Sequence, residues 1–171
     1  MTKNQAYIRY IDVMDAEHVL DWENNVEGWN TQENETPYSI FDILQLIHEL
    51  SDIQKAKQAR WIICEKDSGH QIGAADLTEI DFEHATASVG VLIAKKENRR
   101  SGFASQAISF IEEEARKLGI ERLISTIFPG NKASIQLFEK CGFQKIGKSD
   151  DTYFIDGEYI EALLFDKWLK K

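Results

Sequence analysis

Two arginines and a serine stand before a glycine that opens a long amphipathic segment of the chain. The first turn of a helix leaves backbone N–H groups without partners inside the helix, and the helix dipole adds partial positive charge there. Gly102 would let an anion approach these N–H groups, and Arg99 and Arg100 would add positive charge. The pattern predicts a pyrophosphate site. Its backbone donors would be Arg100, Ser101, Gly102, Phe103, Ala104 and Ser105.

A second candidate segment runs from Asn131 to Phe143. A helix that ends at Gly142 and enters a strand would explain its last two residues. That interpretation leaves Asn131 and Ser134 unexplained, so we expect them to contribute to the same ligand site. Gly142 to Ser149 match the letters of a Walker-type loop, but they fall on the predicted strand Phe143–Lys148 and open no predicted helix, so a Walker-type loop is excluded. A Rossmann fingerprint is excluded because Gly102 lacks companion glycines.

One carboxylate lies in a position that suits proton transfer. Asp76 falls within the predicted strand Ile72–Glu79, among small and apolar residues. Such a group could take a proton from an amine, directly or through water, and Glu79 is the next candidate. The alternative is that Asp76 bonds nearby backbone or hydroxyl groups. The four histidines show no metal-ligand spacing, so no metal is expected.

Apolar periodicity predicts the elements that must position these residues. The expected strands are Tyr7–Ile11, Trp61–Glu65, Gln71–Ile80, Thr86–Ala94, Leu123–Phe128, Phe143–Lys148 and Tyr159–Asp166. The expected helices are Asp15–Asn25 with Asp15 as N-cap, one from Ser39 through Ile53, Gly102–Leu118 and Lys132–Cys141. This order predicts an α/β fold with a mixed, mainly antiparallel central sheet of about seven strands and helices on both faces. Two neighbouring strands would splay around the ligand.

Length and charge limit the kind of partner. The 171 residues predict a single domain over 1–171, and the net charge is −9. No Lys or Arg lies between Tyr10 and Gln54, where eleven acids stand: Asp12, Asp15, Glu17, Asp21, Glu23, Glu27, Glu33, Glu35, Asp42, Glu49 and Asp52. This block would repel nucleic acid and anionic membranes and attract a cationic amine, unless the acids form only solvated helix faces.

The chain is also expected to be cytoplasmic. It has no apolar run of about 18 residues that could span a membrane, and its first residues lack the apolar core of a secretion signal. Cys64 and Cys141 each lie in an apolar segment, which fits two buried free thiols in a reducing compartment.

Taken together, the two motifs resemble the central region of the GNAT superfamily of acyl-CoA N-acyltransferases. The phosphate-loop pattern of that family is matched by Arg99, Gly102 and Ala104. Its downstream pattern is matched by Asn131, Ser134, Phe138, Lys140, Gly142 and Phe143. The early helices, the Ile72-Gly73 strand and the Asp156-Gly157 turn most resemble the branch of ribosomal-protein alanine and polyamine acetyltransferases.

The resemblance implies a GNAT fold and an acyltransferase that moves the acetyl group of acetyl-CoA to a primary amine by direct attack in a ternary complex. The acceptor would be a polyamine-like small molecule or a protein N-terminus, and a homodimer is common among such proteins. It implies that the backbone of Leu92, Ile93 and Ala94 holds the pantetheine arm. An N–H of Leu92 or Ile93 would polarise the thioester carbonyl. Asn131 would bind the pantetheine amides, and Ser134 and Phe138 would flank the thiol.

One departure concerns the proton donor. Many members of the family carry a tyrosine at the position of Phe138, and phenylalanine cannot donate a proton to the departing thiolate. Ser134, Tyr153 or a water would have to serve, or the thiolate leaves unassisted. The departure also leaves open a second function, that of a non-catalytic acetyl-CoA-binding regulatory module.

Overall fold

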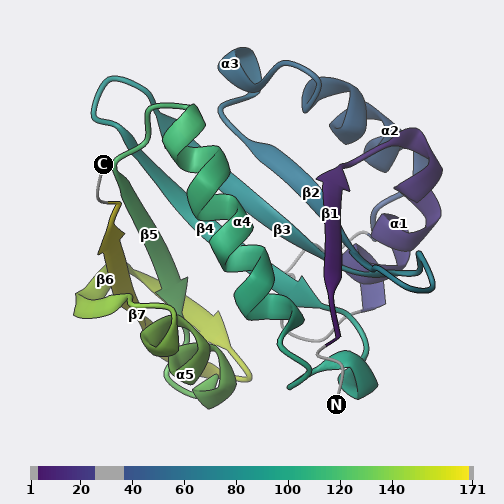
Figure 1. The fold of residues 1–171 in the computed structure, drawn as a ribbon. Helices are drawn as coiled ribbons and strands as arrows, with labels where there is room; N and C mark the ends of the chain where they lie inside the picture. The colour runs from purple at the N-terminus through teal and green to yellow at the C-terminus, as the bar shows by residue number, and fades with distance from the viewer. Residues whose placement is uncertain (1–3, 26–36, 170–171) are drawn as a thin grey trace.

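A single seven-stranded sheet forms the centre of the molecule in the computed structural model, which describes residues 4–25 and 37–169 (Figure 1). Its spatial order is β1-β2-β3-β4-β5-β7-β6. The strands are β1 (Ala6–Tyr10), β2 (Ala59–Glu65), β3 (Gln71–Asp81), β4 (Thr86–Ile93), β5 (Arg122–Ile127), β6 (Gln144–Ile155) and β7 (Glu158–Trp168). Only β4 and β5 pair in parallel among the described strands. The predicted mixed, mainly antiparallel α/β fold is confirmed.

Helices cover both faces of this sheet. They are α1 (Ala16–Asn25), α2 (Ile40–Glu49), α3 (Ile53–Ala56), α4 (Phe103–Lys117) and α5 (Lys132–Lys140), with short 3-10 turns η1 (Val13–Asp15) and η2 (Lys96–Asn98). Helix α4 crosses one face, and α1 and α2 lie on the other side (Figure 1). No helix in the described ranges is long and apolar enough to cross a membrane.

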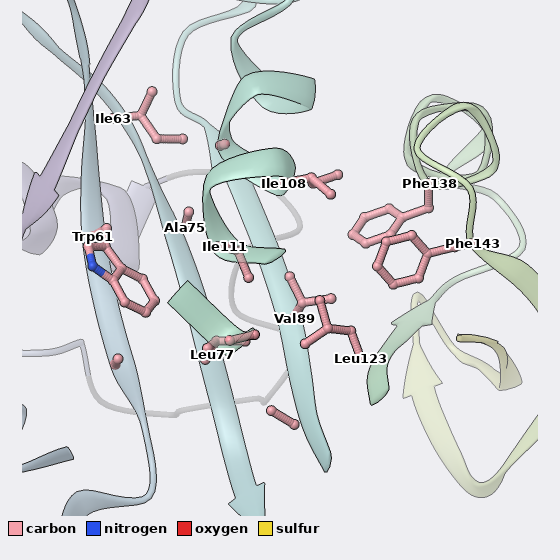
Figure 2. Close-up of a cluster of buried hydrophobic side chains, with 14 of the residues drawn as sticks. Trp61, Ile63, Ala75, Leu77, Val89, Ile108, Ile111, Leu123, Phe138 and Phe143 are labelled. Carbon is pink, nitrogen blue, oxygen red and sulfur yellow. The ribbon is translucent and has the colours of Figure 1, made fainter. Parts of the chain in front are cut away.

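Strand alternation sends neighbouring side chains to two separate cores. Trp61, Leu77 and Val89 pack with Ile108 and Ile111 of α4 (Figure 2). Residues an odd number of positions away on the same strands, such as Ile62, Ala74 and Leu92, point to the other face and pack against α1 and α2. Each fully buried side chain of this size contributes about 1.5 to 3 kcal/mol, so both helical layers are fixed firmly to the sheet.

The helix predicted from Ser39 through Ile53 is in fact two helices. Ser39 begins α2 as expected, and its side chain and that of Asp42 form a capping box. The helix ends at Glu49, and Asp52 then caps the separate short helix α3 by accepting from the Lys55 N–H. Apolar periodicity continues through both helices, so the pattern alone did not reveal the break.

Asp15 does not cap the first helix. Asp12 caps η1 and shares a capping box with Asp15, and α1 follows directly. Asp15 is fully buried, and its two oxygens accept from Nη1 and Nη2 of Arg9, each at 2.8 Å. The other departures are smaller: β6 continues to Ile155 rather than ending at Lys148.

Both cysteines are free thiols. Cys64 is buried in the core under α1 and α2, as predicted, and burial raises the pKa of its thiol. Cys141, at the end of α5, is only half-buried.

Candidate active site

The parallel strands β4 and β5 are paired over only a short stretch. Thr86, Ala87 and Ser88 face Arg122, Leu123 and Ile124, and no further pairing between the two strands exists in the described chain. Beyond Ser88 the strands diverge, β4 remaining with β3 and β5 with β7 (Figure 1). We call this point the fork. It is the splay that the sequence predicts, and it leaves the end of β4 with hydrogen-bonding groups on its β5 side.

Backbone direction decides which residues of β4 present those groups. The N–H of Ala94 donates to the carbonyl of Ile72, so Ala94 faces β3. Because directions alternate along a strand, Leu92 also faces β3, and Ile93 and Val91 face the fork. Of the two N–H groups suggested for the thioester carbonyl, that of Ile93 therefore has the suitable direction. Val91, which the sequence analysis did not select, shares it.

The loop after β4 folds back toward the fork. Nε of Arg99 donates to the carbonyl of Ile93 at 3.2 Å, which ties the loop to the end of β4. Arg100 and Gly102 both have positive φ, +62° and +85°. Such a conformation suits glycine and is unusual for arginine, so the loop is strained immediately before α4. Both arginine side chains are largely exposed.

The start of α4 is open to an anion. No side chain among the described residues caps Gly102, and the first turn of α4 carries no acidic residue. Ser105 donates its hydroxyl to the Gly102 carbonyl and leaves the N–H groups alone. The side chain of Phe103 is buried in the core, so only its backbone is available to a ligand. An uncapped helix start with adjacent arginines suits the pyrophosphate predicted there.

Gln106 holds this loop in place, and the sequence analysis missed it. Its Nε2 donates to the carbonyls of Gly102 and Asn4, and its Oε1 accepts from the N–H of Ala6. The side chain therefore joins the loop to the edge strand β1. No local motif marks such a residue, because its partners in and beside β1, Ala6 and Asn4, lie 100 and 102 residues away.

The second motif has a structural role besides the predicted one. Asn131 is the N-cap of α5, and its Oδ1 accepts from the Ser134 N–H at 3.1 Å. That interaction leaves the Nδ2 donor of the amide for a ligand. Phe138 is buried, with its ring against Phe143 at 4.9 Å in an edge-on contact (Figure 2). Its ring belongs to the core of the α4 face, and Ser134 is half-buried.

An acidic pocket of about 360 Å³ opens beside the fork. Its lining residues come from α1, β2, β3, β4 and β5: Glu23, Arg60, Asp76, Thr78, Glu79, Ser88, Val89, Gly90 and Thr126. Three carboxylates stand against one guanidinium, an excess of two negative charges. Of the predicted acidic block, Glu23 reaches this pocket; Glu27, Glu33 and Glu35 lie outside the described residues. The other described acids of the block, apart from the buried Asp15, are largely exposed.

Arg60 organises the floor of this pocket. Its Nε and Nη2 donate to the two oxygens of Asp76 at 2.8 and 2.9 Å, and its Nη1 donates to Oε1 of Glu23 at 2.7 Å. All three side chains are mostly buried. Burial alone would lower the pKa of Arg60, but the charges and hydrogen bonds of Asp76 and Glu23 raise it above its ordinary value. The guanidinium therefore remains charged and fixes the orientation of both carboxylates.

The residue across from Asp76 in the sheet is a glycine. Gly90 is paired with Asp76 across β3 and β4, and a Cβ added to Gly90 would meet no described atom within 4 Å. Glycine weakens a strand, and neither positive φ nor close packing requires it here. Its absent side chain leaves space between Asp76 and the fork. No group of three or more metal-ligating side chains occurs in the described part of the chain.

The remaining candidate proton donor lies farther along the sheet. Tyr153 of β6 packs its ring edge-on against Phe128, just after β5, with 5.1 Å between the centroids. The residues that sequence analysis missed are Arg60, Ser88, Gly90 and Gln106. Arg60 could be found only from the strand register, because Arg60 and Asp76 become cross-strand partners when β2 pairs with β3.

Comparisons with known proteins agree with this geometry. A family profile described as "Acetyltransferase (GNAT) domain" matches residues 6–144. The uncharacterized N-acetyltransferase YoaA of Bacillus subtilis (strain 168) is 31% identical over 146 residues, covering 84% of this chain and 82% of that protein. The spermidine N(1)-acetyltransferase of Vibrio cholerae serotype O1 is 28% identical over 142 residues, 80% of each chain. A crystal structure of spermidine N-acetyltransferase from Vibrio cholerae in complex with CoA and spermine superposes with a TM-score of 0.83 at 22% identity, over 96% of each chain, and shows a shared fold.

Proposed function

The chain belongs to the GNAT acetyltransferase family, and on that basis we propose which residues carry its reaction and which amines it accepts. It is an N-acetyltransferase whose acyl donor is acetyl-CoA. The observation that carries the proposal is that the acidic pocket and the fork meet at the same residues of β4. Ser88, Val89 and Gly90 line the acidic pocket, and β4 leaves β5 at the same residues.

The cofactor end of the proposal rests on backbone groups. The N–H groups at the start of α4 would bind the pyrophosphate, with Arg99 and Arg100 adding charge. The backbone groups of Val91 and Ile93 that face the fork would hydrogen-bond the pantetheine arm as if it were an added strand. Nδ2 of Asn131 would donate to the amide oxygens of the pantetheine. The N–H of Ile93 would hold the thioester oxygen as negative charge develops on it.

Asp76 would take the amine proton, through a water if its two oxygens stay on Arg60. The amine nitrogen then attacks the thioester carbonyl carbon, a C–N bond forms, and the C–S bond breaks. Coenzyme A leaves as the thiolate and receives the second nitrogen proton. No covalent intermediate with the protein is needed. The acidic pocket favours an acceptor that carries positive charge, as a polyamine does.

A panel of amines tests this function. Acetyl-CoA is supplied with polyamines, amino acids, aminoglycosides or peptide N-termini, and both thiol release and the acetylated product are measured. We expect product with a small cationic amine and none with the same amine already acetylated. If acetyl-CoA binds but no amine yields product, the chain is a binding module and the proposal is wrong. Formation of a homodimer stays a prediction that sedimentation can test.

A further inference from the structure

Glu79 has a backbone conformation that its residue type does not favour. Its φ is +49°, in the left-handed region, at the irregularity in β3 between Thr78 and Asp81. Glycine or asparagine would occupy this position with less strain. Bulges of this kind re-aim side chains and occur often beside active sites. The strained backbone at this bulge therefore changes the direction in which the Glu79 carboxylate points.

The carboxylate of Glu79 is held at the edge of the acidic pocket. The hydroxyl of Ser88 donates to its Oε2 at 2.7 Å, and both residues line the pocket. Ser88 is the last residue of β4 that pairs with β5. A serine on one strand thus fixes a strained glutamate on the next, close to the fork.

The spacing of the two carboxylates suggests what they bind together. Asp76 lies opposite Gly90, and Glu79 is held by Ser88, two residues back on the same face of β4. Two residues along a strand span about 7 Å. With bonds of about 1.5 Å, the terminal nitrogens of a three- or four-carbon diamine lie about 5 to 6 Å apart when extended. The two spacings are similar, so a diamine lying alongside the strand can place one nitrogen within hydrogen-bond reach of each carboxylate.

We propose that Glu79 is a specificity-determining residue, which binds a second ammonium group three or four carbons from the nitrogen that reacts beside Asp76. The inference rests on the proposed function and sharpens its acceptor class. The acceptor is a diamine or longer polyamine. A peptide N-terminus has an uncharged amide at that distance and would leave Glu79 without a cation.

The other charges of the pocket support this assignment. Glu23 and Asp76 share Arg60, so the guanidinium lies at the Asp76 end. Glu79 is paired with a hydroxyl and with no cation among its described contacts, and its side chain is exposed enough for a ligand to reach. The second ammonium of a diamine would supply the missing positive charge.

The test compares putrescine, a four-carbon diamine, with butylamine, which lacks the second nitrogen. The wild-type chain should prefer putrescine by roughly tenfold or more in kcat/KM, since a charge-assisted hydrogen bond discriminates by about that factor. Glu79→Gln should lose most of this preference, because its KM should rise more for putrescine than for butylamine. The wild-type preference should shrink at high salt because screening weakens the pair.

Ala85 provides a matched control for strain. It also has positive φ, +54°, lies in the connection between β3 and β4 and does not line the pocket. Glu79→Gly and Ala85→Gly should each raise the denaturation midpoint by relieving strain, but only Glu79→Gly should lose the preference for putrescine.

The outcomes separate the two proposals. If the wild-type chain acetylates no amine, the proposed function fails. If it acetylates amines but treats putrescine and butylamine alike, or prefers a peptide N-terminus, the Glu79 inference fails alone. It fails equally if Glu79→Gln retains the wild-type preference.

Discussion

At the scale of single residues, each acidic group near the fork is held by a specific partner. Both oxygens of Asp76 accept from Arg60, and Glu79 accepts from Ser88. Side chains fixed in this way lose little entropy when a substrate binds, so the pocket is organised in advance. The partners also explain why Asp76 is tolerated in the sheet, since a buried carboxylate requires compensation.

The predicted role of Asp76 can be tested by Asp76→Asn, which keeps the shape and removes the proton acceptor. If Asp76 takes the amine proton, kcat/KM at neutral pH should fall by about a hundredfold or more. The remaining activity should rise with pH by about tenfold per unit, because it depends on amine already deprotonated in solution. The measurement is a pH–rate profile from pH 6 to 9.

Glu23→Gln is the control for the Asp76 variant. It removes the other carboxylate partner of Arg60 and leaves Asp76 in place, so it should keep the wild-type shape of the profile. If the pH–rate profile of Asp76→Asn runs parallel to that of the wild type, Asp76 does not take the amine proton.

Candidate site residues could be selected from the sequence by their type and position, but the residues that they contact could not be predicted. Asp76 stood out as a carboxylate in a strand, and Gly102 as a small residue before a helix. Arg60 contacts a residue 16 positions away, and Gln106 contacts residues 100 or more positions away, as strand register and the docking of β1 decide. The positive φ of Glu79 has no signature in its residue type.

At the scale of elements, local signals predicted the two helices that begin at the proposed cofactor-binding residues. Helix α4 begins one residue after Gly102, and α5 begins after Asn131, both close to the predicted bounds. Where a boundary depended on tertiary contacts, prediction failed. Asp15 looked like a cap because it precedes an amphipathic helix, yet its carboxylate joins three elements. It accepts from Arg9 of β1, from Gln71 of β3 and from the N–H of Asp12 before η1.

The hydrogen bonds that Asp15 accepts make the stability of the folded protein depend on pH. Burial alone would raise the pKa of Asp15, but its hydrogen bonds from Arg9, Asp12 and Gln71 hold the pKa below its ordinary value. The native state therefore binds the proton less readily than the unfolded state. The stabilisation is complete above about pH 4, the unfolded pKa, and is lost as pH falls through the lower native value.

Asp15→Asn should accordingly lower the free energy of unfolding by about 2 to 4 kcal/mol at pH 7, because Arg9 loses its buried partner. The difference from wild type should shrink as pH falls below 4. Urea titrations at pH 7 and at pH 3 measure this. An equal difference at both pH values would rule out the ionised Asp15 as its source.

At the scale of the whole molecule, the acidic pocket and the loop that we propose binds the pyrophosphate are joined by one strand. Side chains at Asp76, Ser88 and Gly90 share the face of the sheet that α1 and α2 cover, as do Ala74 and Leu92. The loop that follows the same β4 leads into α4 on the opposite face (Figure 1). Because β4 and β5 part at Ser88, a thioester carbonyl can lie between a cation site and an anion site. The order of elements along the sequence predicted the splay of two neighbouring strands; the exact pairing length at the fork did not follow from sequence.

The most direct test of the account asks whether acetyl-CoA binds at the start of α4. Gly102→Asp places a negative charge at the helix N-terminus, and Gly69→Asp makes the same change at another left-handed glycine, in the β2–β3 turn. Isothermal titration with acetyl-CoA should give at least tenfold weaker binding for Gly102→Asp and a Kd within about twofold of wild type for Gly69→Asp. Unchanged affinity in folded Gly102→Asp would place the cofactor elsewhere and contradict the account.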